Sequence, residues 1–100
     1  MMSKVYSVDE IRQLAVPIAQ RYGVAKLALF GSYARGEQSA DSDIDFIIEK
    51  GAIRGWEFFG FIDELEKSLN THVDVLTYKT LRDSMIRDAL RDEVVIYEKS

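Results

Sequence analysis

Two aspartates, Asp43 and Asp45, are the residues of this sequence with the clearest capacity for chemistry. They occupy alternate positions at the start of an apolar stretch that continues as FII. Side chains at alternate positions of a strand project from the same face, with Cα atoms about 7 Å apart. Carboxylate oxygens at that spacing can converge on one divalent cation. The pair therefore predicts a metal site on one face of a strand.

A glycine-bounded segment precedes the aspartates. Residues 31–36 read GSYARG and directly follow the apolar run LALF. Glycine at such a turn lets backbone N–H groups face an anion such as phosphate. A phosphate-binding turn beside a carboxylate pair is typical of phosphoryl or nucleotidyl transfer. Arg35 in this segment is a candidate for a phosphate contact, although a surface arginine in a loop is an equally good interpretation.

Two better-known motifs are excluded by single positions. The two glycines of the GSYARG segment have the spacing of a Walker A loop, but residues 37–38 are EQ where that loop requires Lys and then Ser or Thr. The acidic residues that precede Phe46 imitate the start of an EF-hand. Phe46, however, replaces the required glycine, and Ala52 stands at the position of the bidentate glutamate. The segment is therefore neither a P-loop nor a calcium-binding loop.

A third aspartate, Asp74, interrupts the β-branched and aromatic run VDVLTY. A carboxylate in a half-buried strand is costly unless it is paired or bound to metal. If this strand lies beside the first acidic strand, Asp74 comes within about 5 Å of Asp43 or Asp45. Three such carboxylates repel one another unless cations neutralise them, and two Mg²⁺ ions about 3.5–4 Å apart would do so. The alternative for Asp74 is an edge-strand charge that faces water.

The elements that must position these residues follow from periodicity and capping. Ser7 and Glu10 match a capping box, and Gly23 marks the end of the helix that they begin. The expected order is helix 7–22, strand 24–30, turn 31–36, strand 43–49, helix 56–69, strand 73–78, helix 80–91 with Thr80 as its cap, and a strand or packed tail at 94–97. This order predicts an α+β (mixed α/β) fold, with a small mixed sheet of about three or four strands packed against about four helices.

Several other side chains receive a structural interpretation. Helix 56–69 is expected to bury one apolar face: Phe58, Ile62, Leu65 and Leu69. Trp56 and Phe59 then point to a different side, where they form a partner surface; the alternatives are that they cover a sheet edge or that the helix is rotated. Tyr33 and Glu37 are expected at the surface. The single histidine, His72, precedes a strand and is expected to be a surface or sheet-end residue rather than a base.

Composition sets the remaining limits. One hundred residues with 47% apolar and 30% charged side chains predict one globular domain that spans residues 1–100. A net charge of −4 gives no electrostatic footprint for long nucleic acid, although a nucleotide can still be a substrate through metal ions. The sequence has no cysteine, no signal-peptide core and no apolar run of membrane-spanning length. We therefore expect a cytoplasmic protein with no membrane partner.

The combination of GSYARG, SDID and the later strand aspartate resembles the DNA polymerase β-type nucleotidyltransferases. The similarity is closest to the minimal nucleotidyltransferase (MNT) family and extends over most of the chain. The resemblance implies a nucleotidyltransferase that uses a nucleoside triphosphate such as ATP and two Mg²⁺ ions. By the same resemblance, Gly31 and Ser32 hold the triphosphate, Asp43 and Asp45 ligate metal, and Asp74 binds the catalytic metal and helps to deprotonate the acceptor hydroxyl.

The resemblance also implies a partner. Many MNT proteins pair with HEPN ribonuclease toxins, and some act as antitoxins by transferring AMP to a toxin tyrosine. Larger members of the superfamily bind base and acceptor with a second domain, so a partner protein or a second copy of the chain is expected to complete this site. Two alternatives stay open at this point. The chain could inhibit its partner by contact without catalysis, or it could modify a small hydroxylated molecule such as an aminoglycoside.

Overall fold

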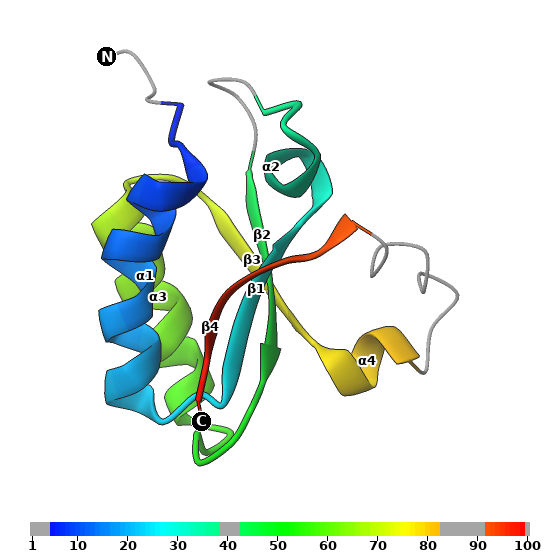
Figure 1. Ribbon diagram of the computed structural model, residues 1–100. Coiled ribbons are helices and arrows are strands. Elements are labelled where there is room, and N and C mark those ends of the chain that lie inside the picture. The colour runs from blue at the N-terminus through cyan, green and yellow to red at the C-terminus, as the bar shows by residue number, and fades with distance from the viewer. Residues whose placement is uncertain (1–4, 39–42, 83–91, 100) are drawn as a thin grey trace.

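The computed structural model describes residues 5–38, 43–82 and 92–99. The helices and strands in these ranges are α1 (Val8–Tyr22), β1 (Lys26–Phe30), α2 (Gly31–Arg35), β2 (Ile44–Glu49), α3 (Glu57–Leu69), β3 (Val73–Thr77), α4 (Tyr78–Arg82) and β4 (Val94–Glu98). The strands form one sheet in the order β3-β2-β1-β4 (Figure 1). Strands β2 and β3 run parallel, whereas β1 is antiparallel to both of its neighbours. The predicted α+β fold with a mixed sheet is therefore confirmed.

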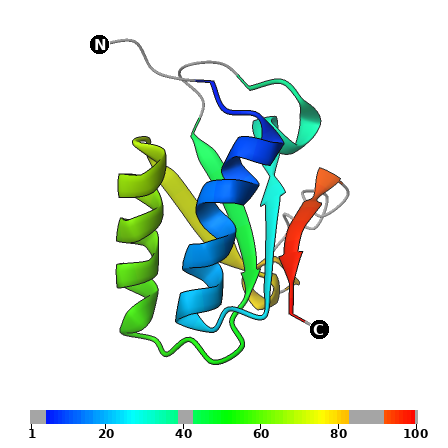
Figure 2. The same cartoon turned by 60° about the vertical axis from the view of Figure 1, so that its left-hand side comes forward.

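The helices are distributed over both faces of the sheet. Helices α1 and α3 lie side by side on one face, and α4 lies on the other side (Figures 1 and 2). Connection of the parallel strands β2 and β3 requires a crossover, and α3 supplies it. None of the helices in the described ranges is both long and apolar enough to cross a lipid bilayer.

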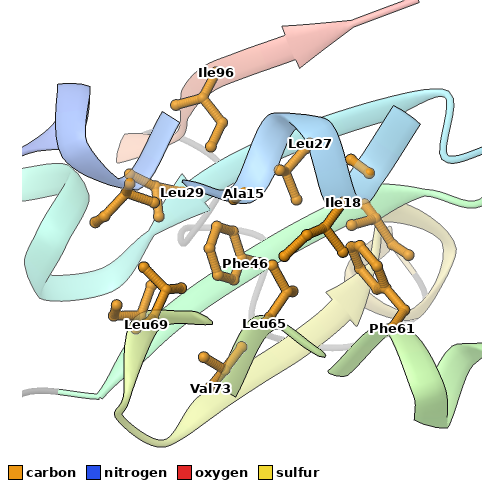
Figure 3. Close-up of a cluster of buried hydrophobic side chains, with 14 of the residues drawn as sticks. Ala15, Ile18, Leu27, Leu29, Phe46, Phe61, Leu65, Leu69, Val73 and Ile96 are labelled. Carbon is orange, nitrogen blue, oxygen red and sulfur yellow. The ribbon is translucent and has the colours of Figure 1, made fainter. Parts of the chain in front are cut away.

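The main core fills the space between the sheet and the helix pair (Figure 3). Its largest fully buried side chains include Ile11, Leu27, Leu29, Ile44, Phe46, Ile48, Phe61, Leu65 and Leu69. Alternation along β2 sends Ile44 and Phe46 into this core, so the residues between them face the opposite side of the sheet. A smaller cluster of Ile47 and Tyr78 covers part of that second face.

Local signals define α1 as expected. The Ser7 hydroxyl accepts from the backbone N–H of Glu10 at 3.1 Å, and the Glu10 carboxylate accepts from the backbone N–H of Ser7 at 3.0 Å. The helix ends at Gly23, whose φ of 77° is in the left-handed region that favours glycine. These contacts confirm the capping box and the end of the helix.

The inward face of α3 differs from the prediction by a rotation. Phe61 is fully buried, together with the expected Leu65 and Leu69, whereas Phe58 and Ile62 are only partly buried. Contact with α1 explains the difference, because the ring of Phe61 packs edge-on against Tyr22 with centroids 5.7 Å apart. Apolar periodicity alone does not show which flank of a helix meets a second helix.

Helix α4 begins earlier than expected. Its first residue is Tyr78, and the Thr77 hydroxyl accepts from the backbone N–H of Thr80 at 3.1 Å. Thr77 therefore supplies the cap that the sequence analysis assigned to Thr80. The remainder of the expected helix 80–91 lies outside the described residues from position 83 onward. The expected C-terminal strand is present as β4.

Candidate active site

The parallel pairing of β2 and β3 brings the three aspartates to one end of the sheet. Asp45 stands opposite Asp74 in the register, and Ile44 stands opposite Val73. The backbone N–H of Ile44 donates to the carbonyl of His72 at 3.2 Å, which places Asp43 beside His72. Because Ile44 and Phe46 enter the main core, Asp45 on β2 and Asp43 just before it face the other side of the sheet, as Asp74 does on β3. The structure thus gathers the predicted metal ligands on one face.

Gly31 directly adjoins this carboxylate group. It has a φ of 72°, and a Cβ atom built on it would lie only 2.5 Å from Oδ2 of Asp45. The neighbouring residue Phe30 is the cross-strand partner of Asp45, which explains the close approach. Position 31 therefore requires glycine for two reasons: the backbone conformation, and the space that the Asp45 carboxylate occupies. Ser32 follows in the first turn of α2 and is partly exposed.

The surroundings of Asp45 shift the pKa of its carboxyl group. Partial burial, followed by the negative charges of Asp74 and Asp43, raises the pKa of Asp45 from 3.8 to about 6. Ionisation of Asp45 therefore costs free energy, which a bound divalent cation would offset. Carboxylate oxygens are the ligands that a hard cation such as Mg²⁺ prefers, so the donor set fits this ion.

His72 joins the aspartates from the same strand edge. Its Nε2 lies 3.2 Å from Oδ1 of Asp74, and its Nδ1 lies 3.2 Å from Oε2 of Glu66. Ligand atoms of Asp43, His72 and Asp74 all lie within 4.8 Å of one another. The Asp74 charge is the main cause that raises the pKa of His72, with further contributions from Asp43 and Glu66.

The exposure of His72 agrees with its expected place at the end of the sheet, but sequence reasoning missed its contacts. The available signal was the spacing of two positions between His72 and Asp74, which puts both side chains on one face of a strand. Glu66 carries no such signal, because it approaches from α3.

In and next to the rest of the GSYARG segment, the structure agrees with the predicted exposure of Glu37 and contradicts that of Tyr33. Arg35 pairs with Glu37, from Nε to Oε1 at 2.9 Å, and its Nη1 lies 4.0 Å from Oδ2 of Asp92. Glu37 is exposed, as expected. Tyr33 is not at the surface, since only 2% of it is exposed and it belongs to the main core. The prediction for Tyr33 was wrong because α2 is a full helical turn that packs one side chain inward.

Comparison with known proteins extends these observations. The family model described as the nucleotidyltransferase domain matches residues 11–97. "Putative protein adenylyltransferase MJ0435" from Methanocaldococcus jannaschii is 37% identical over 92 residues, which cover 89% of this chain and 96% of that protein. "Protein adenylyltransferase MntA" from Thermococcus cleftensis is 32% identical over 80 residues, which cover 79% of this chain and 81% of that protein.

Solved structures agree with the family assignment. A chain in the crystal structure of a toxin–antitoxin with AMP-PNP matches with a TM-score of 0.69 at 18% identity, over 89% of this chain and 74% of that chain. At this identity the likeness shows the shared fold alone. The family match, the relatives and the predicted motifs agree. The chain therefore belongs to the nucleotidyltransferase domain family and is a nucleotidyltransferase.

Proposed function

We propose that this chain is a Mg²⁺-dependent adenylyltransferase that transfers AMP from ATP to a hydroxyl group of a partner protein. The observation that carries the proposal is the placement of Asp43, Asp45 and Asp74 on one face of two parallel strands, against the turn at Gly31. The names of the relatives support a protein as the acceptor. In this proposal, residues 1–100 act as one minimal domain, and the partner completes the acceptor site.

Each residue has a defined part in the proposed reaction. Asp43, Asp45 and Asp74 would hold two Mg²⁺ ions, which neutralise charge on the attacking and leaving oxygens. Backbone N–H groups at Gly31 and Ser32 would face the triphosphate, and Arg35 would have to leave Glu37 to contact a phosphate. Asp74 accepts the proton of the acceptor hydroxyl. A bond forms between the acceptor oxygen and the α-phosphorus, the bond to the bridging oxygen of the β-phosphate breaks, and pyrophosphate leaves.

The competing function is inhibition of a partner by contact alone. A binding surface has no need for three mutually repelling carboxylates. Burial, followed by the charges of Asp74 and Asp43, raises the pKa of Asp45, so its ionised form costs free energy. The electrostatics of the site therefore favour catalysis over contact inhibition. We propose that the partner is a HEPN-type toxin, in line with the toxin–antitoxin complexes among structures that share this fold. A second copy of this chain stays the alternative partner.

Calorimetry tests the metal and nucleotide requirement directly. Wild-type protein titrated with ATP should bind in the presence of Mg²⁺ and lose that binding in EDTA, because the carboxylates need a cation to receive the triphosphate. We expect Asp43→Asn to weaken the Mg²⁺-dependent affinity about tenfold or more. When labelled ATP is incubated with the partner toxin, the wild-type protein should transfer labelled AMP to the toxin, and the Asp43→Asn variant should not. Equal ATP binding with and without Mg²⁺, or transfer by the Asp43→Asn variant at the wild-type rate, would contradict the proposal.

The predicted partner surface gives a second test. Trp56 and Phe59 are 74% and 75% exposed, and Phe59 also lines a cavity of about 700 Å³. Exposed aromatic side chains of this size are typical of binding hot spots. We expect the double variant Trp56→Ala/Phe59→Ala to weaken partner binding by about 10–100-fold, with the unfolding temperature nearly unchanged.

Val95→Ala is the matched control for this surface. Val95 is an exposed apolar residue of β4, at the opposite edge of the sheet from β3. Surface plasmon resonance with the immobilised partner should give the wild-type affinity for this variant. Unchanged affinity of the double aromatic variant would instead assign Trp56 and Phe59 to the ordinary protein surface.

A further inference from the structure

The side chains of Glu66 and His72 link the C-terminal part of α3 to Asp74, the third aspartate of the site. Glu66 Oε2 lies 3.2 Å from Nδ1 of His72, and Nε2 of His72 lies 3.2 Å from Oδ1 of Asp74. We propose that His72 is a positioning residue that holds the Asp74 carboxylate in one orientation and is itself held by Glu66. This role rests on the proposed function, in which Asp74 receives the acceptor proton.

Asp74 needs such support more than Asp45 does. Asp45 lies on a central strand, is partly buried, and has Gly31 directly against its carboxylate. Asp74 lies on the edge strand β3, and 54% of its side chain is exposed. An exposed aspartate samples several χ1 rotamers unless a contact selects one of them. The imidazole, two positions earlier on the same face, supplies that contact.

The imidazole is fixed from its other side. The same oxygen of Glu66 that faces Nδ1 of His72 also accepts from the backbone N–H of Val73 at 3.1 Å. Glu66 is therefore anchored to the strand that carries Asp74, and not only to α3. A histidine that faces a carboxylate at each ring nitrogen has its ring plane defined by both contacts. Through these contacts, the position of Glu66 on α3 determines the orientation of the Asp74 side chain.

Direct ligation of a metal ion by His72 is the competing role. Ligand atoms of His72, Asp43 and Asp74 are close enough to share a cation. Nε2 of His72, however, lies at hydrogen-bond distance, 3.2 Å, from Oδ1 of Asp74, and Nδ1 faces the Glu66 carboxylate at the same time. This geometry favours orientation of Asp74 through hydrogen bonding over a place among the metal ligands.

The first test does not depend on activity. Three-bond NMR couplings of the Asp74 β-methylene group should report one χ1 rotamer in the wild-type protein and an average over rotamers in His72→Phe. The phenylalanine ring keeps the bulk of the imidazole but offers no hydrogen bond. Asp63→Asn is the control, because Asp63 forms an exposed ion pair with Lys67 on α3 that has no part in this network. Unchanged Asp74 couplings in His72→Phe would overturn the proposal.

The second test separates positioning from other roles by kinetics. We expect His72→Phe to lower kcat for AMP transfer about tenfold, with KM for ATP within about twofold of wild type. His72→Gln should recover part of kcat, because its amide can donate to Asp74. A rise in KM for ATP together with the fall in kcat, or a ¹⁴N coupling to bound Mn²⁺ in pulsed EPR that disappears in His72→Phe, would instead make His72 a metal ligand. If wild-type protein transfers no AMP while the NMR couplings change as expected, the positioning role stands and the proposed function fails.

Discussion

The Asp45→Asn variant is expected to be more stable than the wild-type protein in EDTA and to lose AMP transfer by about 10³-fold or more. Both effects come from the same carboxylate. The pKa of Asp45 in the folded chain is raised from 3.8 to about 6, mainly by burial and then by Asp74 and Asp43. At neutral pH the ionised group therefore opposes folding, and asparagine removes that charge while it keeps the shape.

The expected gain is about 1–2 kcal/mol at pH 7, after allowance for solvent screening of a partly exposed group. The sign of the pH dependence follows from linkage. Between pH 6 and pH 4 the folded state holds a proton on Asp45 that the unfolded state releases, so acidification through this window stabilises the metal-free wild type. His72 gives a slope of the same sign but above pH 6.5, because its pKa is raised from that value. The decrease in the pH dependence of the free energy of unfolding in Asp45→Asn measures the contribution of Asp45.

Urea unfolding in EDTA at several pH values measures the stability effect, and transfer of labelled AMP measures the activity. Glu98→Gln is the control, because Glu98 is an exposed carboxylate on β4, at the end of the sheet away from the aspartates. It should leave transfer unchanged. Mg²⁺ should raise the unfolding temperature of the wild type but not that of Asp45→Asn. A less stable Asp45→Asn variant in EDTA at pH 7 would contradict the electrostatic account of the site.

Gly31→Ala is expected to lose transfer by about 100-fold or more, although the new side chain is a single methyl group. The added Cβ would lie 2.5 Å from Oδ2 of Asp45, so the carboxylate must rotate away. The backbone also pays for a φ of 72°, which costs about 1–2 kcal/mol for a residue other than glycine. Only the end of the Asp45 side chain must rotate to relieve the clash. The substitution should therefore weaken metal and nucleotide binding more than it lowers the stability of the fold.

Gly36→Ala provides a closely matched control. Gly36 has the same φ of 72°, but its Cβ atom would meet nothing within 4 Å. The two variants should therefore lose similar amounts of stability in thermal unfolding, while Gly31→Ala alone loses Mg²⁺-dependent ATP binding in calorimetry and transfer of labelled AMP. Equal activity of the two variants would show that the position of Asp45 is not what Gly31 protects.

The acidic part of the site was largely predictable, because spacing along a strand is a local property. The spacing of two positions from Asp43 to Asp45 fixes a common face without knowledge of the fold. The place of Asp74 was predictable only on the condition that its strand neighbours β2. The pairing of Asp45 with Asp74 meets that condition.

Predictions failed where the deciding contact comes from another element. Phe61 is buried because α1 presents Tyr22 to it, and Tyr33 is buried because α2 forms a full turn against the sheet. Glu66 reaches His72 only because α3 ends next to the edge of β3. These contacts depend on how separate elements meet in space, so periodicity and capping could not reveal them.

The exposure of the carboxylates at the edge of the sheet has a consequence for the timing of the proposed reaction. Asp43 and Asp74 are open to solvent, and bulk water there screens charge and competes with any acceptor as a nucleophile. A docked protein surface would displace that water and lower the local dielectric constant at the moment when its own hydroxyl arrives. The acceptor would thereby exclude water from the site at which it is modified, and hydrolysis of ATP would compete less with transfer in the complex than in the isolated chain.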